Sequence, residues 1–389
     1  MKKVFALLGI FLFVGNSAAY GQVEETEFKA AQKAYLLSRF CTEVKYNFAF
    51  YDKLNFDWDS LCIASMPVLT ATSSNEDFFK GMQALCARLH DGHTYIFHMN
   101  NPKNQDDWIR PFPIRTKRIG DRVFVTEVYS SDFRNKGVVR GCEILEIDGE
   151  KVLDYGNRHI RPYLASSTRQ WSEYRPFAEF ELTKSKGSKV SRILFRSVDG
   201  ENFMIESNRN IPWDLQEETS SMAFKVLAGN IGLLTVGSFQ NSDFNRAYFD
   251  ELYGEILKTN ALIIDIRDNS GGNSSHADYL MSHFSGRPIR QGVWRSPMYI
   301  AAHASWNYPR EWYMQTPDPV SPVLKEDVYQ KPVVLLVNAT TFSSAENFCV
   351  LFKSAERGKI IGTPTGGSTG NPNLYRSWVW ARLLHLYQA

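Results

Sequence analysis

The spacing of apolar residues changes twice along the chain and divides it into three stretches. From about residue 24 to 89, apolar positions recur at helical intervals, and from about 110 to 202 they form short runs typical of strands. From about residue 229, apolar strands alternate with amphipathic helices. The pattern therefore predicts an α/β protein with a helical beginning and a β-rich middle.

The clearest helix of the first stretch starts at Ser74, which forms a capping-box-like pattern with Asp77. Its apolar stripe is Phe78, Met82, Leu85, Cys86 and Leu89. Gly92 provides a natural stop. We therefore expect His93 on a turn just past a helix end, with its side chain presented rather than buried.

The middle stretch has apolar runs at 123–128, 144–147, 179–182 and 190–195, separated by Asp-Gly turns. Each run is expected to form a strand. A basic cluster at Arg115, Lys117 and Arg118 is interpreted as a solvated face rather than a binding patch.

The third stretch has strands at 231–236, 261–266 and 333–337, and a helical stripe over 244–256. Continuous apolar strands alternating with helices predict a sheet covered on both faces. Polar segments follow two of the strands, at 267–272 and 338–346. In such sheets, sites gather at the carboxyl ends of strands, so both segments are candidate site loops.

Ser343 is the candidate nucleophile of the second polar segment, because it directly precedes a predicted helix over 345–353. Free backbone N–H groups at a helix start stabilise negative charge on a substrate oxygen. The alternative is that Thr341, Ser343 or Ser344 merely caps the helix.

The first polar segment contains Gly271 and Gly272, which permit close approach of a substrate to peptide N–H groups. One of these amides and one near Ser343 could form an oxyanion hole; the alternative is an ordinary turn. Asp265 and Arg267 are interpreted as an ion pair that fixes this turn.

A hydroxyl nucleophile needs a base, and the sequence offers eight histidines. His93 lies on the turn described above, His90 near the last helical turn, and His276 after the glycine turn. Taken alone, each of them is more simply explained as a structural residue.

The N-terminus has the layout of a secretory signal peptide. Lys2 and Lys3 precede an apolar run over 4–14, and small residues follow at 17–19. The run is shorter than the roughly 20 residues that a membrane-spanning helix needs. We expect cleavage after Ala19 or Gly21, with export to the periplasm or outside the cell and no stable membrane span afterwards; an uncleaved anchor is the alternative.

Composition excludes several classes of protein. The 389 residues carry a net charge of +2, which gives no bulk field for nucleic acid. Five cysteines are widely spaced, with no Cys-x-x-Cys pair, so we predict no zinc framework, no metal and no other cofactor. Mostly free thiols, with one disulfide at most, are expected.

Four motifs in order resemble the S41 serine peptidases, which comprise the C-terminal processing or tail-specific proteases and their tricorn-like and retinoid-binding relatives. The motifs are LHDGHT (89–94), LIIDIRDNSGGN (262–273), VNATTFSSAE (337–346) and IIGTPTGGS (360–368). The resemblance covers nearly the whole chain after the signal peptide.

The resemblance implies a ClpP/crotonase-type α/β core with an N-terminal helical region and an inserted PDZ-like β domain. The corresponding boundaries are 1–21 for the signal peptide, 22–104 for the helical region, 105–205 for the PDZ-like domain and 206–389 for the core. Within the PDZ-like domain, Cys142 stands where the family usually has aspartate. Such a domain would engage a polypeptide substrate by its C-terminus.

When the functional positions of the family are matched to this sequence, the resemblance implies that Ser343 is the nucleophile. In the processing-protease branch a lysine base follows 25 residues later, but Ser368 stands there. The tricorn-like branch instead implies His93 as general base. The family's oxyanion-hole positions correspond to Gly271 or Gly272 and the amide of Ser344.

The tail departs from the family pattern after about residue 373. Residues 374–389 can be encoded by codons that, when the reading frame is shifted by one nucleotide, encode a β segment resembling that of the family. We therefore expect a truncated or frameshifted reading of a longer gene, without the orienting glutamate that the tricorn-like branch implies further downstream.

The sequence thus predicts an exported serine endopeptidase with Ser343 and His93 as its catalytic pair. The alternatives are a non-catalytic ligand-binding protein of the same family and an inactive truncated member.

Overall fold

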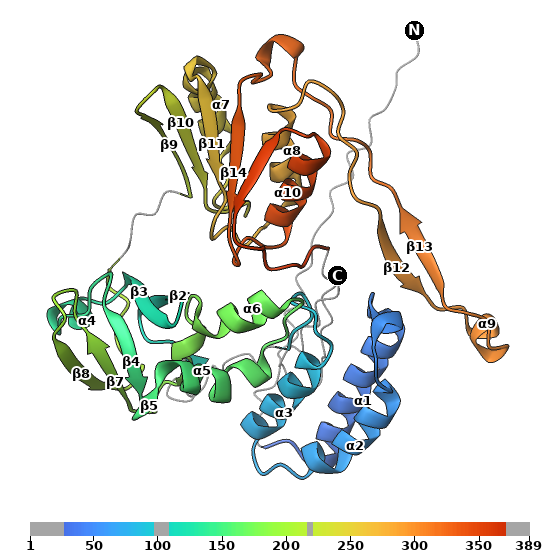
Figure 1. The fold of residues 1–389 in the computed structure, drawn as a ribbon. Helices are drawn as coiled ribbons and strands as arrows, with labels where there is room; N and C mark the ends of the chain where they lie inside the picture. Colours follow the sequence, from blue (N-terminus) through green and yellow to red (C-terminus); the bar gives the residue numbers. More distant parts are fainter. Residues whose placement is uncertain (1–26, 97–108, 216–220, 371–389) are drawn as a thin grey trace, which may run out of the picture.

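The computed structural model describes residues 27–96, 109–215 and 221–370, and these form three units that each have their own hydrophobic core (Figure 1). We name them the helical unit (27–96), the middle unit (109–215) and the core unit (221–370). The expected signal peptide (1–21) and the divergent tail (374–389) lie outside the described residues.

The first unit is helical, as the sequence predicts, and it contains three α-helices. They are α1 (Ala30–Asn47), α2 (Trp58–Thr70) and α3 (Asn75–Ala87). Ser74 caps α3 by accepting the amide of Asp77 at 3.0 Å. A disulfide joins Cys41 to Cys62, and the other three cysteines are free, in agreement with the expected cysteine usage.

The middle unit is built on an antiparallel sheet of order β2-β3-β4-β7-β8, with β5 paired to β4. Its strands are β2 (Ile114–Ile119), β3 (Arg122–Val128), β4 (Glu143–Ile147), β5 (Glu150–Lys151), β7 (Ser191–Arg196) and β8 (Asn202–Ser207). Its helices are α4 (Ser131–Asn135), α5 (Val152–His159) and α6 (Arg169–Tyr174). Two short strands, β1 (Ile109–Arg110) and β6 (Ser185–Lys186), pair separately.

The strand expected at 179–182 is wrong. Glu181–Thr183 form a 3-10 turn, and Glu179 has a φ of 56°. The apolar side chain of Leu182 is nevertheless buried, so the apolar run at 179–182 reflects burial in the core and not a strand.

The core unit contains a five-stranded sheet of order β15-β14-β11-β10-β9, parallel except for β9. The strands are β9 (Met222–Leu227), β10 (Ile231–Val236), β11 (Ala261–Asp265), β14 (Val333–Val337) and β15 (Gly358–Gly362). The helices that share its core are α7 (Arg246–Lys258), α8 (Ser274–Ser282) and α10 (Ser344–Ser354).

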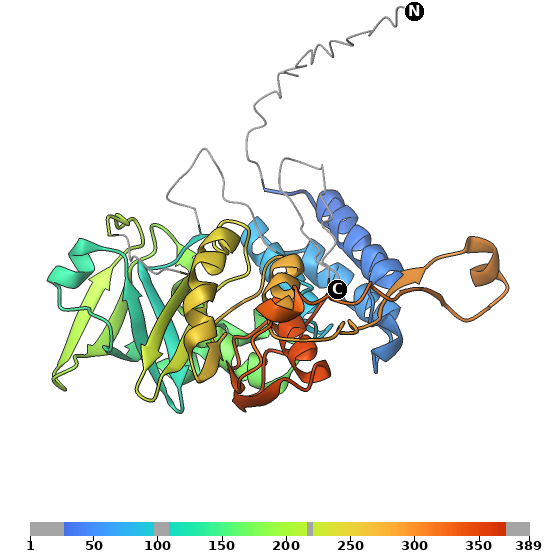
Figure 2. The ribbon, with the colours of Figure 1, turned by 90° about the horizontal axis from the view of Figure 1, so that it is seen from above.

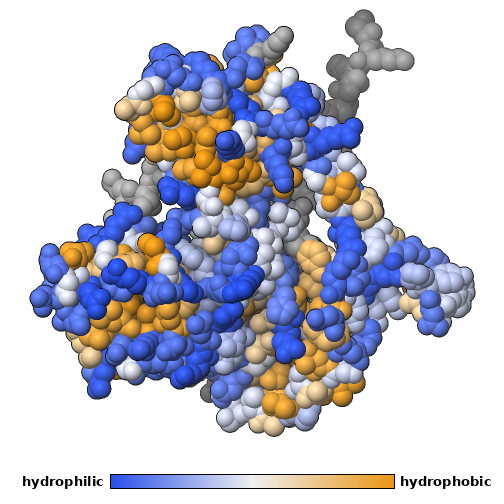
Figure 3. Space-filling view, in the orientation of Figure 1, coloured by the Kyte–Doolittle hydropathy of each residue, from blue (hydrophilic) through white to orange (hydrophobic). Residues whose placement is uncertain are grey.

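The expectation that this sheet is covered on both faces is wrong for the described residues. Alternate residues such as Leu234, Leu262 and Leu335 are fully buried against the helices, whereas Leu233 and Val334 on the other face are only half-buried. Figure 3 shows the resulting apolar patch over the strands of the core unit. The mixed α/β class is confirmed.

A hairpin arm of β12 (Trp294–Met298) and β13 (Glu311–Gln315) extends away from the body and carries the short helix α9 (Ala301–Ser305) (Figures 1 and 2). Arg295 attaches its base to the helical unit by an ion pair with Asp52 at 2.8 Å. In the described part of the chain, no helix is both long and apolar enough to cross a membrane.

Candidate active site

Ser343 lies where the loop after β14 turns into α10. Its backbone has φ 57° and ψ −123°, a conformation that L-residues rarely adopt, and its side chain makes no capping hydrogen bond. The hydroxyls of Thr341 and Ser344 donate to the carbonyls of Ile266 and Gly272 instead. The helix-cap alternative is therefore wrong for all three residues, and the hydroxyl of Ser343 is left for another partner.

That partner is His93, which follows α3 on a tight turn. Its Nε2 lies 3.0 Å from Ser343 Oγ. The side chain is only 7% exposed, because it stacks on Phe342 with a ring separation of 4.7 Å and is covered by the loop that contains Ser368. The turn was predicted correctly, but the expectation of a presented side chain was wrong.

Burial lowers the pKa of His93 below its ordinary value. The carboxylate of Asp91 opposes this shift by favouring the imidazolium, and the nearby Arg175 guanidinium reinforces it. A lowered pKa keeps the ring neutral at physiological pH, which is the protonation state that a general base needs.

The loop over 365–368 completes the surroundings of this pair, and α10 holds it in place. Glu346 accepts the amides of Gly367 at 2.7 Å and Ser368 at 2.5 Å, and burial raises the pKa of its carboxyl. The carbonyl of Ser368 accepts the amide of Ser343 at 2.9 Å, and its hydroxyl lies 2.6 Å from His93 Nδ1. The sequence identifies Ser368 only as the residue at the position where the processing proteases have a lysine. Nothing in the sequence indicates that the hydroxyl of Ser368 contacts His93.

The glycine turn packs directly against Ser343. A Cβ added to Gly271 would lie 2.6 Å from Ser343 Cβ and 2.8 Å from the amide nitrogen of Ser344. The amide of Gly271 donates to Asn269 Oδ1 at 2.9 Å. In contrast, the amides of Gly272 and Ser344 have no hydrogen-bond partner within the described residues. Of the two candidate glycines, Gly272 is therefore the one whose N–H is available.

The other candidate histidines lie outside this constellation. His276 accepts from Arg246 at 3.1 Å and contacts Asn241 Oδ1 at 3.1 Å. His90 adopts φ 52° at the end of α3 and is exposed.

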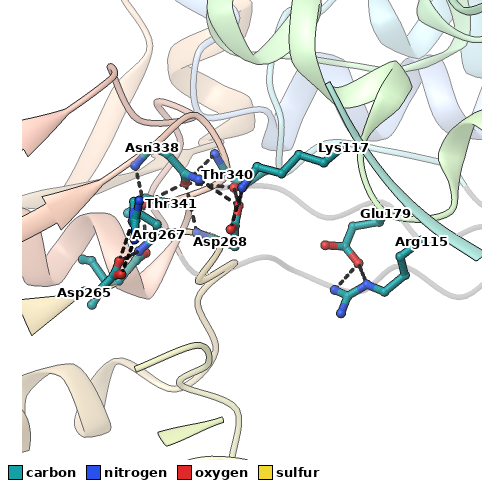
Figure 4. A network of polar contacts seen from close by, with 10 residues as sticks. Arg115, Lys117, Glu179, Asp265, Arg267, Asp268, Asn338, Thr340 and Thr341 are labelled. Carbon is teal, nitrogen blue, oxygen red and sulfur yellow. Dashed lines mark hydrogen bonds and ion pairs between the residues drawn. The ribbon is translucent and has the colours of Figure 1, made fainter. Parts of the chain in front are cut away.

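The aspartate after Arg267 fixes both site loops to the middle unit (Figure 4). Asp268 accepts from Thr340 Oγ1 at 2.6 Å and Asn338 Nδ2 at 2.7 Å, both on the loop that leads to Ser343. Lys117, on β2 of the middle unit, donates to the same carboxylate at 2.7 Å. Burial acts to raise the pKa of Asp268, but the bonds from Lys117 and Thr340 outweigh it, so the pKa is lowered.

These contacts correct the interpretation of the basic cluster as a solvated face. Lys117 bridges two units, Arg115 pairs with Glu127 and Glu179, and Arg118 lies over the ring of Phe177.

The predicted ion pair at the first site loop is confirmed: Arg267 binds Asp265 through two nitrogens at 2.9 and 2.6 Å (Figure 4).

The described residues offer no cluster of three or more His, Cys, Asp or Glu side chains that could hold a metal ion. The groups gathered here are a hydroxyl, an imidazole and backbone amides, which is the set that acyl transfer uses.

Solved structures with the same fold are similar to this chain over most of its length. A structure of mature CPAF in complex with lactacystin superposes with a TM-score of 0.70 at 15% sequence identity, covering 92% of this chain and 89% of that chain. A second structure of mature CPAF gives a TM-score of 0.66 at 15% identity, with coverages of 92% and 88%. At these identities the likeness establishes a shared fold.

The sequence itself matches a family model over residues 230–377, which includes both site loops and Ser343. The model is described as peptidase family S41. Residues 230–377 of the chain are therefore similar to peptidase family S41.

Proposed function

We propose that the chain is a serine endopeptidase in which Ser343 is the nucleophile and His93 is the general base. The observation that carries the proposal is the 3.0 Å contact between His93 Nε2 and Ser343 Oγ, two residues that are 250 positions apart. An ordered contact over that separation, next to two unpartnered amides, matches the geometry of nucleophilic acyl transfer.

In the first step, His93 takes the hydroxyl proton as Ser343 Oγ attacks a peptide carbonyl. The amides of Gly272 and Ser344 donate to the oxyanion that forms, an interaction that can contribute about 3 kcal/mol per donor. His93 then gives the proton to the leaving amine, and the acyl-enzyme is released by a water that His93 activates in the same way. A ligand-binding role without catalysis would not require this hydrogen-bonded pair.

The middle unit is proposed to act as a PDZ-like module that captures the C-terminal tail of a polypeptide substrate by strand addition to its sheet. Its antiparallel sheet and the Asp148-Gly149 turn, with φ values of 51° and 81°, support this assignment. Peptides that differ only in a free or amidated C-terminus test it: amidation should weaken turnover, and equal turnover of both would contradict tail capture.

The catalytic assignment is tested with a serine-reactive fluorophosphonate probe and a quenched peptide library. Ser343→Ala should lose labelling and cleavage without a change in melting temperature. Ser354→Ala, an exposed serine at the other end of α10, is the matched control and should behave as the wild type. Labelling that persists in Ser343→Ala would refute the assignment.

Export to the periplasm or the extracellular space remains part of the proposal. The Cys41–Cys62 disulfide supports it, since such bonds persist mainly in oxidising compartments.

A further inference from the structure

The side of His93 that faces away from Ser343 is occupied by a buried polar pair. His93 Nδ1 lies 2.6 Å from Ser368 Oγ, and Ser368 Oγ lies 3.3 Å from Asp91 Oδ1. The exposed fractions of His93, Ser368 and Asp91 are 7%, 6% and 2%. The three groups therefore form a chain of contacts that bulk water does not interrupt.

The direction of the hydrogen bonds in this chain follows from the inventory of protons. A carboxylate only accepts, so the single hydroxyl proton of Ser368 goes to Asp91. The oxygen of Ser368 then accepts from His93, and the ring proton must be on Nδ1. Nε2 is left with a lone pair directed at the hydroxyl of Ser343.

Both supporting residues are themselves fixed. Asp91 also accepts from Thr94 Oγ1 at 2.5 Å and Ser167 Oγ at 3.3 Å. Ser368 is held at its amide by Glu346, and its carbonyl receives the amide of Ser343. The hydroxyl of Ser368 therefore has a defined position relative to both members of the catalytic pair.

We propose that Ser368 and Asp91 are positioning residues that hold His93 in the tautomer with an unprotonated Nε2, with Ser368 as the bridge and Asp91 as the terminal acceptor. The proposal rests on the proposed function, because it assigns His93 the role of base. It supplies the orienting carboxylate from the same turn as the histidine, only two positions before it.

The first test reads the tautomer without any need for turnover. In full-length protein labelled with ¹⁵N-histidine, the signals of His93 are assigned by their absence in His93→Gln. In the neutral range of pH, Nδ1 should carry the proton and Nε2 should show the shift of a bare nitrogen. A proton on Nε2 in the wild-type protein would overturn the proposal.

The second test removes the bridge. Ser368→Ala should release His93 into a mixture of tautomers and lower kcat about 10²- to 10⁴-fold, the range that general acid–base catalysis contributes. Ser368→Thr, which keeps the hydroxyl, should restore the tautomer and most of the rate. The matched control is Ser166→Ala, because Ser166 is equally buried at 7% exposure and its hydroxyl has no partner within the described residues.

If Ser368→Ala fails to fold, Asp91→Asn serves in its place. It keeps an oxygen for Ser368 but removes the charge that favours the imidazolium, so the acid limb of the rate profile should move to lower pH. The proposal would be overturned if Ser368→Ala left both the His93 tautomer and kcat unchanged. It would also be overturned if Asp91→Asn left the acid limb of the pH–rate profile unchanged. A confirmed Nδ1–H tautomer in a protein that shows no peptidase activity would instead refute the proposed function and leave the hydrogen-bond chain standing.

Discussion

The backbone of Ser343, the proposed nucleophile, is strained, and replacing this residue by glycine should release that strain. Its φ of 57° and ψ of −123° match the first central position of a type II′ turn, which glycine dominates. A non-glycine residue in such a conformation costs about 1–3 kcal/mol. Ser343→Gly removes this cost but adds about 0.5–1 kcal/mol of chain entropy.

The stability of Ser343→Gly is best compared with that of Ser343→Ala. Both variants lose the contact between Ser343 Oγ and His93, but only Ser343→Ala keeps the backbone strain. The glycine variant should therefore be more stable than the alanine variant by about 0.5–2 kcal/mol. With a urea m-value of roughly 2 kcal/mol/M, the unfolding midpoint of the core unit should rise by about 0.2–1 M.

The assay is urea unfolding of Ser343→Gly and Ser343→Ala. Neither variant is expected to show peptidase activity. The same pair of substitutions at Ser354, in the last turn of α10, is the control. There the backbone is helical, so glycine should be the less stable of the two. Equal midpoints at position 343, or a higher midpoint for alanine, would show that the conformation of Ser343 is not strained.

Two further results are expected. The acid limb of kcat/KM should lie below pH ~6.5, the ordinary histidine value, because the lowered pKa keeps His93 neutral and competent as the pH falls; a limb above pH ~7 would contradict this. Lys117→Met should cost at most about 1 kcal/mol of stability in thermal unfolding, since its ion pair is partly exposed, and should reduce activity by loosening the loops that Asp268 holds. Lys258→Met, which removes an exposed pair on α7, is the control, and equal activity losses in both variants would rule out a role for the bridge between units.

The sequence predicted the elements that carry the site more accurately than the surroundings of its side chains. The strands at 231–236 and 333–337 were placed to the residue, and the helix after Ser343 to within one residue at each end. Apolar runs bounded by turn residues define such elements locally, so no distant contact was needed to find them.

The parts that were missed depend on contacts between distant segments. The burial of His93 comes from Phe342 and the loop near Ser368, which are about 250 or more positions away. The connection of Lys117 to Asp268 likewise joins two units. Local periodicity contains no information about such contacts, so it predicts an exposed side chain on the His93 turn and a solvated basic cluster.

The long separation between His93 and Ser343 also determines when the proposed catalytic pair can form. During synthesis His93 emerges 250 positions before Ser343 and 275 positions before Ser368. The helical unit and the core unit each contain one member of this pair, so the pair forms only when the two units dock. Under the proposed function, a chain that is only partly synthesised would therefore lack the complete pair.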